Sequence, residues 1–275
     1  MSKQKPKTVL ITGSSTGIGR ETAIYFQKKG WNVAATMRTP NKESVLTKME
    51  NVIVPSLDVT DTKSIKDAVN LTISKFGKID AIVNNAGYGL TGPFEGSTPE
   101  QIKKQYDTNV FGIMNVMREV LPHFRANKSG VIVNVASMGG RIVFPYYSLY
   151  HGTKWAVEGF TEALRFELEP LGIRVKIVEP GAIKTDFYER SNDSTIQNSP
   201  VEYKELCEKA FKNYQKTEAG ATAPEKVAKV IFKAADDGSK KLRYAVGPDA
   251  KSLLFLRNIL PDGVYAGIVR LAVLK

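Results

Sequence analysis

The sequence has few residues that bind metals or form disulfides. It holds one cysteine, Cys207, and two histidines, His123 and His151, in 275 residues. A single cysteine excludes an intramolecular disulfide and any multi-cysteine zinc site, so we expect no metal centre. Such sparse cysteine usage favours a reducing, cytoplasmic setting. We predict that Cys207 is not a nucleophile.

Long apolar runs are also absent. No uninterrupted stretch reaches the roughly 18 residues of a membrane-spanning helix, and the apolar run at residues 9–11 is too short for a signal peptide. The most apolar region is an extension at 248–275, interrupted by Arg257, Pro261, Asp262 and Arg270. It could rest on a membrane surface. We favour a role in covering a pocket or forming a subunit interface.

Charge is plentiful but not concentrated. The formal net charge is +11, which suits an acidic partner such as a phosphorylated cofactor. The lysines are scattered, and neither a long basic run nor an aromatic-and-basic module occurs. We therefore expect a solvated, lysine-rich surface and no nucleic-acid partner.

Short apolar runs alternate with longer amphipathic stretches. The runs expected to be strands are 8–12, 32–36, 51–57, 79–84, 130–136, 174–180 and 243–247. The stretches expected to be helices are 18–30, 61–76, 99–127, 150–170 and 224–237. Continuously apolar strands are typical of a sheet covered on both faces. The pattern predicts an α/β fold: one Rossmann-type, doubly wound domain over 1–275, with a parallel sheet of about seven strands.

The segment 183–223 interrupts this alternation. Its first part is polar and rich in helix breakers, and residues 201–216 then have a helical pattern. A long insertion after the carboxyl end of a strand is where an α/β domain places substrate contacts or a lid. A mobile surface excursion is the alternative interpretation.

A glycine-rich turn follows the first expected strand. Gly13, Gly17 and Gly19 stand between that strand and a helix. Glycines there permit a tight turn and let backbone N–H groups approach a pyrophosphate at the helix N-terminus. The spacing G-x-x-x-G-x-G differs from the general fingerprint G-x-G-x-x-G, and an ordinary tight turn is the alternative.

The end of the second strand indicates which dinucleotide is bound. An acidic residue there would bind the ribose hydroxyls of NAD. This sequence has Met37 followed by Arg38. An arginine can bind a 2′-phosphate with two hydrogen bonds, so the pattern favours NADP. A plain surface arginine is the alternative.

The stretch "YYSLYHGTKWAVEG" (146–159) contains three tyrosines. Residues four apart share a helix face, and only Tyr150 has a lysine, Lys154, at that offset. A free tyrosine has a pKa of about 10, and a nearby ammonium lowers it. Tyr150 is therefore a candidate acid/base. We interpret His151, which points off this face, as a packing or surface residue.

These motifs form an ordered set with Asn84–Gly87, Ser137 and the dipeptide Pro180–Gly181. The set resembles the short-chain dehydrogenase/reductase family over about residues 7–247. Within the family, "NNAGYGLTGPFE" and "YHGTKWAVEGFTEALRFEL" are similar to the 17β-hydroxysteroid and retinol dehydrogenase branch. Each residue alone also has a structural interpretation, such as a turn cap for Ser137 or a helix lysine for Lys154.

The resemblance implies a role for each matching position. Ser137 would bind the substrate oxygen, Tyr150 would be the acid/base, Lys154 would lower its pKa and hold the ribose, and Asn109 would complete the proton relay. The cofactor residues implied by the turn and the family together are Gly13, Ser15, Gly17, Ile18, Gly19, Arg38, Asp58, Val59, Asn85, Ala86, Gly87, Tyr150, Lys154, Pro180, Gly181, Ile183 and Thr185.

The function expected from this set is NADP(H)-dependent interconversion of a ketone or aldehyde and its alcohol by hydride transfer. Apolar segments at 88–94, 141–147 and 186–190 favour a hydrophobic substrate. A 3-oxoacyl reductase that receives an acidic carrier, and a non-catalytic dinucleotide sensor, are the alternatives. The family resemblance also suggests a homodimer or homotetramer through the 99–127 and 150–170 helices.

Overall fold

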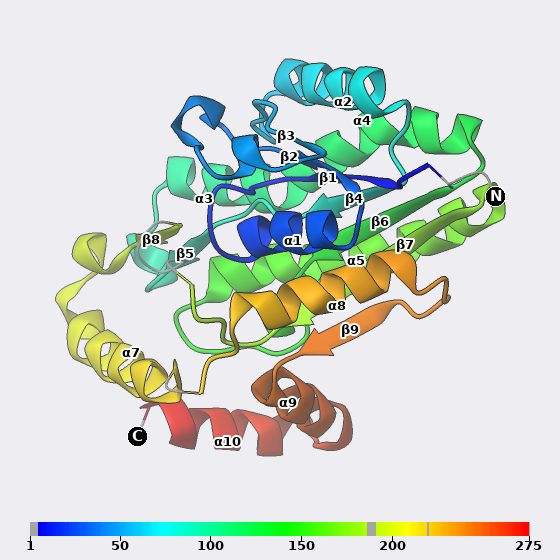
Figure 1. Cartoon of the computed structure of the whole chain (residues 1–275). Coiled ribbons are helices and arrows are strands. Elements are labelled where there is room, and N and C mark those ends of the chain that lie inside the picture. Colours follow the sequence, from blue (N-terminus) through cyan, green and yellow to red (C-terminus); the bar gives the residue numbers. More distant parts are fainter. Residues whose placement is uncertain (1–4, 186–190, 219, 275) are drawn as a thin grey trace.

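The computed structural model of the protein describes residues 5–185, 191–218 and 220–274. Its centre is a parallel sheet of seven strands in the order β3-β2-β1-β4-β6-β7-β9 (Figure 1). The strands are β1 (Thr8–Ile11), β2 (Asn32–Ala35), β3 (Val52–Ile53), β4 (Ala81–Asn84), β6 (Gly130–Val135), β7 (Ile173–Pro180) and β9 (Arg243–Val246). Each corresponds to one predicted apolar run, so the doubly wound fold is confirmed.

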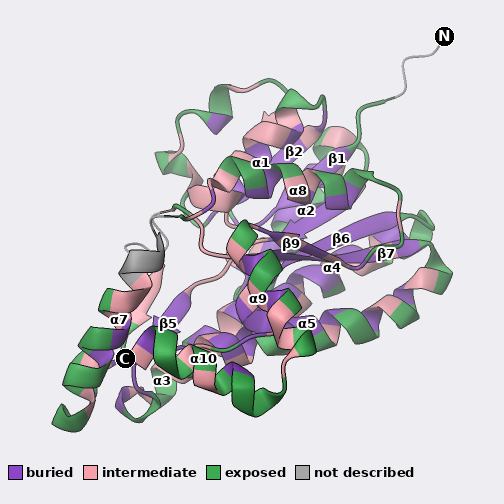
Figure 2. Ribbon diagram, turned by 90° about the horizontal axis from the view of Figure 1, so that it is seen from below, coloured by how far each residue is buried: buried purple, intermediate pink, exposed green. Residues whose placement is uncertain are grey.

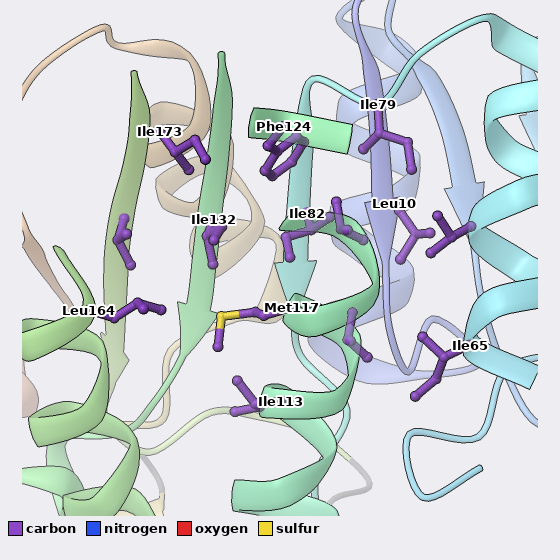
Figure 3. Close-up of a cluster of buried hydrophobic side chains, with 14 of the residues drawn as sticks. Leu10, Ile65, Ile79, Ile82, Ile113, Met117, Phe124, Ile132, Leu164 and Ile173 are labelled. Atoms are coloured by element: carbon purple, nitrogen blue, oxygen red, sulfur yellow. The ribbon is translucent and has the colours of Figure 1, made fainter. Parts of the chain in front are cut away.

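Helices cover both faces of the sheet. Helices α1 (Gly17–Lys28) and α8 (Pro224–Asp236) pack on one face. Helices α2 (Thr62–Phe76), α4 (Gly112–Ala126) and α5 (Ser148–Leu168) pack on the other. Figure 3 shows Ile113, Met117 and Leu164 from this second layer against strand residues such as Ile132. The buried aliphatic side chains of the strands thus meet helices on both sides, as their continuous apolar runs require.

The region 99–127, predicted as one helix, is divided in the structure. Helix α3 (Pro99–Tyr106) begins with a capping box between Thr98 and Gln101. A π-helical turn, Asp107–Phe111, then separates α3 from α4. This wider turn contains Asn109, whose side chain bonds to a neighbouring loop. The prediction of an unbroken helix was therefore wrong at its centre. Such π turns occur often at functional sites.

The insertion 183–223 is attached to the loop that follows β4. Strand β8 (Asn192–Ser194) pairs in parallel with β5 (Gly89–Thr91). The bond from Thr195 N to Thr91 O, 2.9 Å, extends this pairing. Helix α7 (Lys204–Glu218) follows, where the sequence pattern was helical. The short strands β5 and β8 were not predicted, because three residues are too few to show a periodic pattern.

The C-terminal extension forms two helices, α9 (Pro248–Ile259) and α10 (Asp262–Leu274). Leu254 and Tyr265 bury their side chains against Ile142, in the segment after β6. Asn213 on α7 donates to Val273 O at 3.0 Å. The opposite side of the helix pair is exposed (Figure 2); its exposed apolar residues are Phe255, Ile259, Val264, Ile268 and Leu271. None of the helices in the described ranges is both long and apolar enough to span a membrane.

Single 3-10 turns complete the described part of the chain. They lie at Pro40–Lys42, Leu46–Lys48, Phe94–Gly96, Met138–Gly140, Glu169–Leu171, Ile196–Asn198 and Val201–Tyr203. The turn at Met138–Gly140 matters most for the site, because it follows β6 directly and places the chain against α5.

Candidate active site

The carboxyl ends of the parallel strands lie along one edge of the sheet. The glycine turn follows β1, Arg38 follows β2, Asn85 follows β4, Ser137 follows β6 and Pro180 ends β7. Parallel strand order brings these distant segments to one edge, where α/β folds bind ligands. The segments that carry the predicted motifs therefore meet along this edge of the sheet.

The glycine turn is packed against the loop after β4. Gly13 has a φ of +69°, and a Cβ there would lie 2.9 Å from Ala86 Cα, so no larger residue fits. The Thr12 hydroxyl oxygen accepts hydrogen bonds from Asn85 N and Ala86 N, both at 3.0 Å. Asn85 Nδ2 donates to Gly13 O at 3.1 Å. Thr12, which sequence reasoning missed, therefore holds the two loops together.

Helix α1 begins at this turn with its first amides unclaimed by side chains. Thr16 at the N-cap makes no side-chain cap, and the first turn has no acidic residue. Side chains cap α2, through Asp61, and α3, through Thr98, whereas α5, α8 and α9 share the missing cap of α1. An uncapped N-terminus with its positive dipole suits a phosphate group. A Cβ on Gly17 would lie 3.4 Å from Thr185, so the loop after β7 borders the same turn.

Three further predicted cofactor residues, Ser15, Ile18 and Gly19, lie at the glycine turn. Ser15 is exposed beside the turn, and Ile18 packs its side chain against the core. A Cβ on Gly19 would lie only 2.2 Å from Gly13 O, so Gly19 closes the turn. All three lie at the turn, and Ile18 packs against the core there; their binding of a cofactor stays a prediction.

Arg38 is exposed at the end of β2, and no ion pair of its side chain occurs within residues 5–185, 191–218 and 220–274. The other arginine near the turn, Arg20, is already paired: its Nη1 lies 2.6 Å from Glu43 Oε2. Asp58 uses Oδ1 to accept from Thr60 N and Oγ1, at 2.9 and 2.7 Å. Of these residues, Arg38 is thus the cation open to an added phosphate.

The predicted cofactor residues that follow β3 and β7 are close-packed. Val59 is buried, and a Cβ on Gly112 would lie 2.6 Å from its Cγ2. A Cβ on Gly181 would lie 2.2 Å from the Asp249 carboxylate, which accepts from Ala182 N at 2.6 Å. Ile183 forms an isolated parallel bridge with Thr222. Helix α9, through Asp249, therefore fixes the loop that follows Pro180.

Lys154 is held in place by burial and by one hydrogen bond. It is buried on α5 and donates from Nζ to Val135 O at 3.0 Å. The same Nζ lies 5.7 Å from the centre of the Tyr150 ring. Burial lowers the pKa of Lys154 to about 8, and the charge of Glu158 opposes that shift. The helix spacing seen in the sequence thus places an ammonium beside the Tyr150 ring.

Ser137 lies two residues beyond β6 and caps the following turn. Its Oγ accepts from Gly139 N at 3.0 Å. The capping interpretation is correct, yet the hydroxyl still has a hydrogen to donate, since a serine hydroxyl is both donor and acceptor. Capping also fixes where that hydrogen can be directed.

Asn109 is buried in the π-helical turn and bonds to two other elements. Its Oδ1 accepts from Tyr88 N at 3.0 Å, and its Nδ2 donates to Tyr88 O at 2.8 Å. Nδ2 also lies 3.2 Å from Thr153 Oγ1 on α5. A Cβ on Gly87 would lie 3.1 Å from Asn109 Oδ1. Asn109 therefore joins the loop after β4 to α5. Thr153 is the α5 residue that accepts this hydrogen bond, and the sequence did not reveal it.

His151 is buried and neutral. Its Nδ1 lies 2.8 Å from Gly139 O, and its Nε2 accepts from Phe144 N at 3.1 Å. This pair of bonds fixes the tautomer with the proton on Nδ1. Burial lowers the pKa of His151 to about 4. His151 therefore packs, as predicted, and cross-links α5 to the turn after Ser137.

Aromatic rings surround the approach to Tyr150. The Tyr147 ring lies 6.4 Å from the Tyr150 ring and 5.4 Å from that of Tyr214 on α7. Tyr214 OH donates to Pro145 O at 3.0 Å. Phe211 on α7 stacks 6.4 Å from Tyr146. Helix α7 of the insertion thus packs onto the segment before Tyr150. The segment 186–190, also expected there, lies outside the described residues.

Tyr146 and Ser148 line two neighbouring open cavities. One, of about 460 Å³, is also lined by Pro93 and Tyr203. The other, of about 590 Å³, is also lined by Phe144 and Trp155. Tyr146 has a φ of +65°, a region that non-glycine residues rarely adopt. Cys207 is buried nearby, and burial raises the pKa of its thiol.

Comparison with known proteins decides the family. A model of the short chain dehydrogenase family matches residues 7–195. The chain belongs to this short-chain dehydrogenase family. An uncharacterised oxidoreductase of Schizosaccharomyces pombe is 42% identical over 229 residues, covering 83% of this chain and 96% of the relative. A 3-ketodihydrosphingosine reductase of Bacteroides thetaiotaomicron is 34% identical over 268 residues, covering 97% and 98%.

Solved structures of other short-chain dehydrogenases have the same fold as this chain. A short-chain dehydrogenase from Streptomyces avermitilis superposes with a TM-score of 0.83 at 32% identity, covering 98% of this chain and 97% of that one. ElxO with NADP bound superposes with a TM-score of 0.76 at 30% identity, covering 90% and 99%. The protein is thus an oxidoreductase of the short-chain dehydrogenase family, with neighbours that bind NADP.

Proposed function

We propose that the protein is an NADP(H)-dependent reductase of ketones or aldehydes, or oxidises the matching alcohols, on an apolar substrate. The observation that carries this proposal is the position of Lys154. Its ammonium is buried, bonded to Val135 O at 3.0 Å, and lies 5.7 Å from the Tyr150 ring. A buried lysine held beside a tyrosine has the arrangement that general acid catalysis by the phenol requires.

The residues of the cofactor edge fit NADP(H). The uncapped amides of α1 and the packed turn at Gly13 suit its pyrophosphate. Arg38, exposed and without an ion pair to any described residue, suits a 2′-phosphate. NADP(H) supplies the hydride when bound. ElxO, a structural neighbour with bound NADP, is consistent with this choice.

In the proposed reaction Tyr150 donates a proton to the carbonyl oxygen as the alcohol forms. The Lys154 ammonium favours the ionised phenol, which makes the tyrosine a usable acid and base near neutral pH. Ser137 donates a second hydrogen bond to the same oxygen. Asn109 would complete the proton relay from its position against α5. Its Nδ2 donates to Thr153 Oγ1 at 3.2 Å, and that hydroxyl donates to the backbone oxygen of Tyr150 at 2.7 Å.

The apolar substrate is proposed from the rings that flank Tyr150. Tyr147, Phe211 and Tyr214 form an aromatic wall between α5 and α7. Such a wall favours a ketone on an apolar chain or ring over a sugar. The 3-ketodihydrosphingosine reductase relative, which matches nearly the whole chain, is named for a ketone of this kind.

The test is NADPH oxidation by the purified protein with ketones of graded size. The series contains small ketones, long-chain 3-ketones including 3-ketodihydrosphingosine, a steroid ketone and a 3-oxoacyl carrier substrate. We expect turnover with at least one apolar ketone and a higher kcat/KM with NADPH than with NADH. NADPH binding without turnover of any carbonyl would replace the proposal with a dinucleotide sensor. Turnover of the carrier substrate alone would favour the 3-oxoacyl reductase.

A further inference from the structure

Helix α5 carries a line of ionisable residues beyond Lys154. Tyr150, Lys154, Glu158 and Glu162 recur every four residues and share one helix face. Glu158 is only 4% exposed. Isolated buried carboxylates are costly, so one held here needs compensating charges or a function.

A second buried carboxylate and two arginines surround Glu158. Glu179, on β7, is 2% exposed. Arg243, on β9, donates from Nε to Glu158 Oε2 at 2.9 Å and from Nη2 to Glu162 at 2.8 Å. Arg141 donates to Glu179 at 3.3 Å. The charged groups that face Glu158 are therefore Lys154 and Glu162 from α5, Arg141 from the turn after β6, Glu179 from β7 and Arg243 from β9.

The turn after β6 packs closely against the Glu158 side chain. A Cβ on Gly140 would lie 2.7 Å from Glu158 Cγ and 2.9 Å from Lys154 O. Glu158 Oε1 is fully buried and accepts no hydrogen bond from the described residues. The side chain is thus fixed one helix turn from Lys154, with one oxygen left over after its bond to Arg243.

The charge of Glu158 acts on Lys154. Burial lowers the pKa of Lys154 to about 8, and Glu158 is the charge that opposes this shift. Burial also raises the pKa of Glu158 to about 7; Glu179 adds to this rise, and Arg243 and Arg141 oppose it. A structural cross-link between α5 and β9 could be made by Glu162 alone, which already binds Arg243.

We propose that Glu158 is a positioning residue whose carboxylate keeps Lys154 in its ammonium form during proton transfer at Tyr150. The inference rests on the proposed function, because it gives Lys154 the role stated there. Glu158 acts through Lys154 and does not touch the substrate. The nearest comparison is Glu162, one turn farther on, which shares Arg243 but is half exposed.

The test compares the pH dependence of kcat/KM in the wild type, Glu158→Gln and the matched control Glu162→Gln. Without the Glu158 carboxylate, the pH above which kcat/KM falls should decrease by about one pH unit. Glu162→Gln should leave it in place. Glu158→Met is a second variant in case Glu158→Gln does not fold. An apolar residue of similar volume is often tolerated in place of a buried charge, and Arg243 still has its ion pair with Glu162.

A second measurement does not depend on activity. Trace acetylation of Lys154 in the protein without cofactor, followed by mass spectrometry across a pH series, reports the pKa of that amine. We expect a lower value in the folded Glu158 variants than in Glu162→Gln. Equal values, with an unmoved pH profile, would overturn the inference while the wild type still reduces ketones. A wild type without turnover would instead count against the proposed function, and the acetylation comparison would still decide the role of Glu158.

Discussion

Lys154 Nζ donates to the carbonyl oxygen of Val135 across 3.0 Å, which joins the middle of α5 to the last residue of β6. This bond fixes the ammonium at the edge of the sheet where the carboxyl ends of β1, β4 and β7 also lie. A flexible lysine is thereby held in one place before any ligand arrives. Pre-organised charge of this kind is what an active site needs.

Replacing the buried ammonium tests its role. In Lys154→Met the apolar stem is kept and the charge is lost, so we expect turnover to fall by at least about 10²-fold while the protein stays folded. The control is Lys176→Met. Lys176, on β7, is also buried, but its Nζ donates to Lys241 O in the loop before β9, away from Tyr150. That variant should lose thermal stability and keep its kcat. Equal kcat losses in the two variants would contradict the account.

The cofactor preference should depend on Arg38. In Arg38→Asp the 2′-phosphate of NADP loses a partner and meets a like charge, so we expect the ratio of kcat/KM for NADPH over NADH to fall by about tenfold or more. The control is Lys66→Asp, the same change of charge on the exposed side of α2. An unchanged ratio in Arg38→Asp would show that another residue selects the phosphate.

Much of this arrangement is predictable from the sequence. Most strands of the sheet are short, continuously apolar runs, which are typical of a sheet covered on both faces. The order of strands then brings the glycine turn, Asn85, Ser137 and Lys154 to one edge. These residues could be assigned to one site because a parallel sheet leaves little freedom in where its strand ends lie.

The remainder depends on contacts between distant segments. Nothing in the local pattern of 99–127 predicts a π-helical turn, since the turn is fixed by Asn109 bonding to Tyr88. Thr12 and Thr153 look like ordinary threonines until the loops meet. Glu158 looks like a solvated helix glutamate until β9 brings Arg243 beside it. Three-residue strands such as β5 form only because β8 lies alongside.

Tyr146 should limit the size of the substrate. It lines both cavities, of about 460 and 590 Å³. In Tyr146→Ala the two spaces should merge, so we expect the ratio of kcat/KM for a bulky over a small ketone to rise by about tenfold. Tyr25→Ala, which removes a ring on the distant helix α1, is the control. The same ratio in Tyr146→Ala and the wild type would remove Tyr146 from the pocket.

His151 should make the protein less stable in acid. Its pKa is about 4 in the fold against an ordinary 6.5, so below pH 6.5 the unfolded chain takes up a proton that the folded chain does not. The free energy of unfolding should therefore lose about 2 to 3 kcal/mol from this residue between pH 6.5 and 4.5. His151→Gln keeps a donor and an acceptor and should remove that dependence.

The measurement is the difference in unfolding free energy between His151→Gln and the wild type at pH 7 and at pH 4.5. Glu158 and Glu179, whose pKa values burial raises, act with opposite sign in part of the same range. They are present in both proteins, so the difference isolates His151. His123→Gln is the control. A difference that does not change with pH would mean that His151 has the same pKa in the fold as in the unfolded chain.

The central claim is that Tyr150 exchanges the proton with the substrate oxygen. It is tested most directly by single-turnover NADPH oxidation in Tyr150→Phe, with Tyr147→Phe as the neighbouring control and NADPH binding followed by fluorescence. We expect Tyr150→Phe to bind NADPH as the wild type does and to oxidise it at least about 10²-fold more slowly with the best ketone. Oxidation at the wild-type rate would contradict the account.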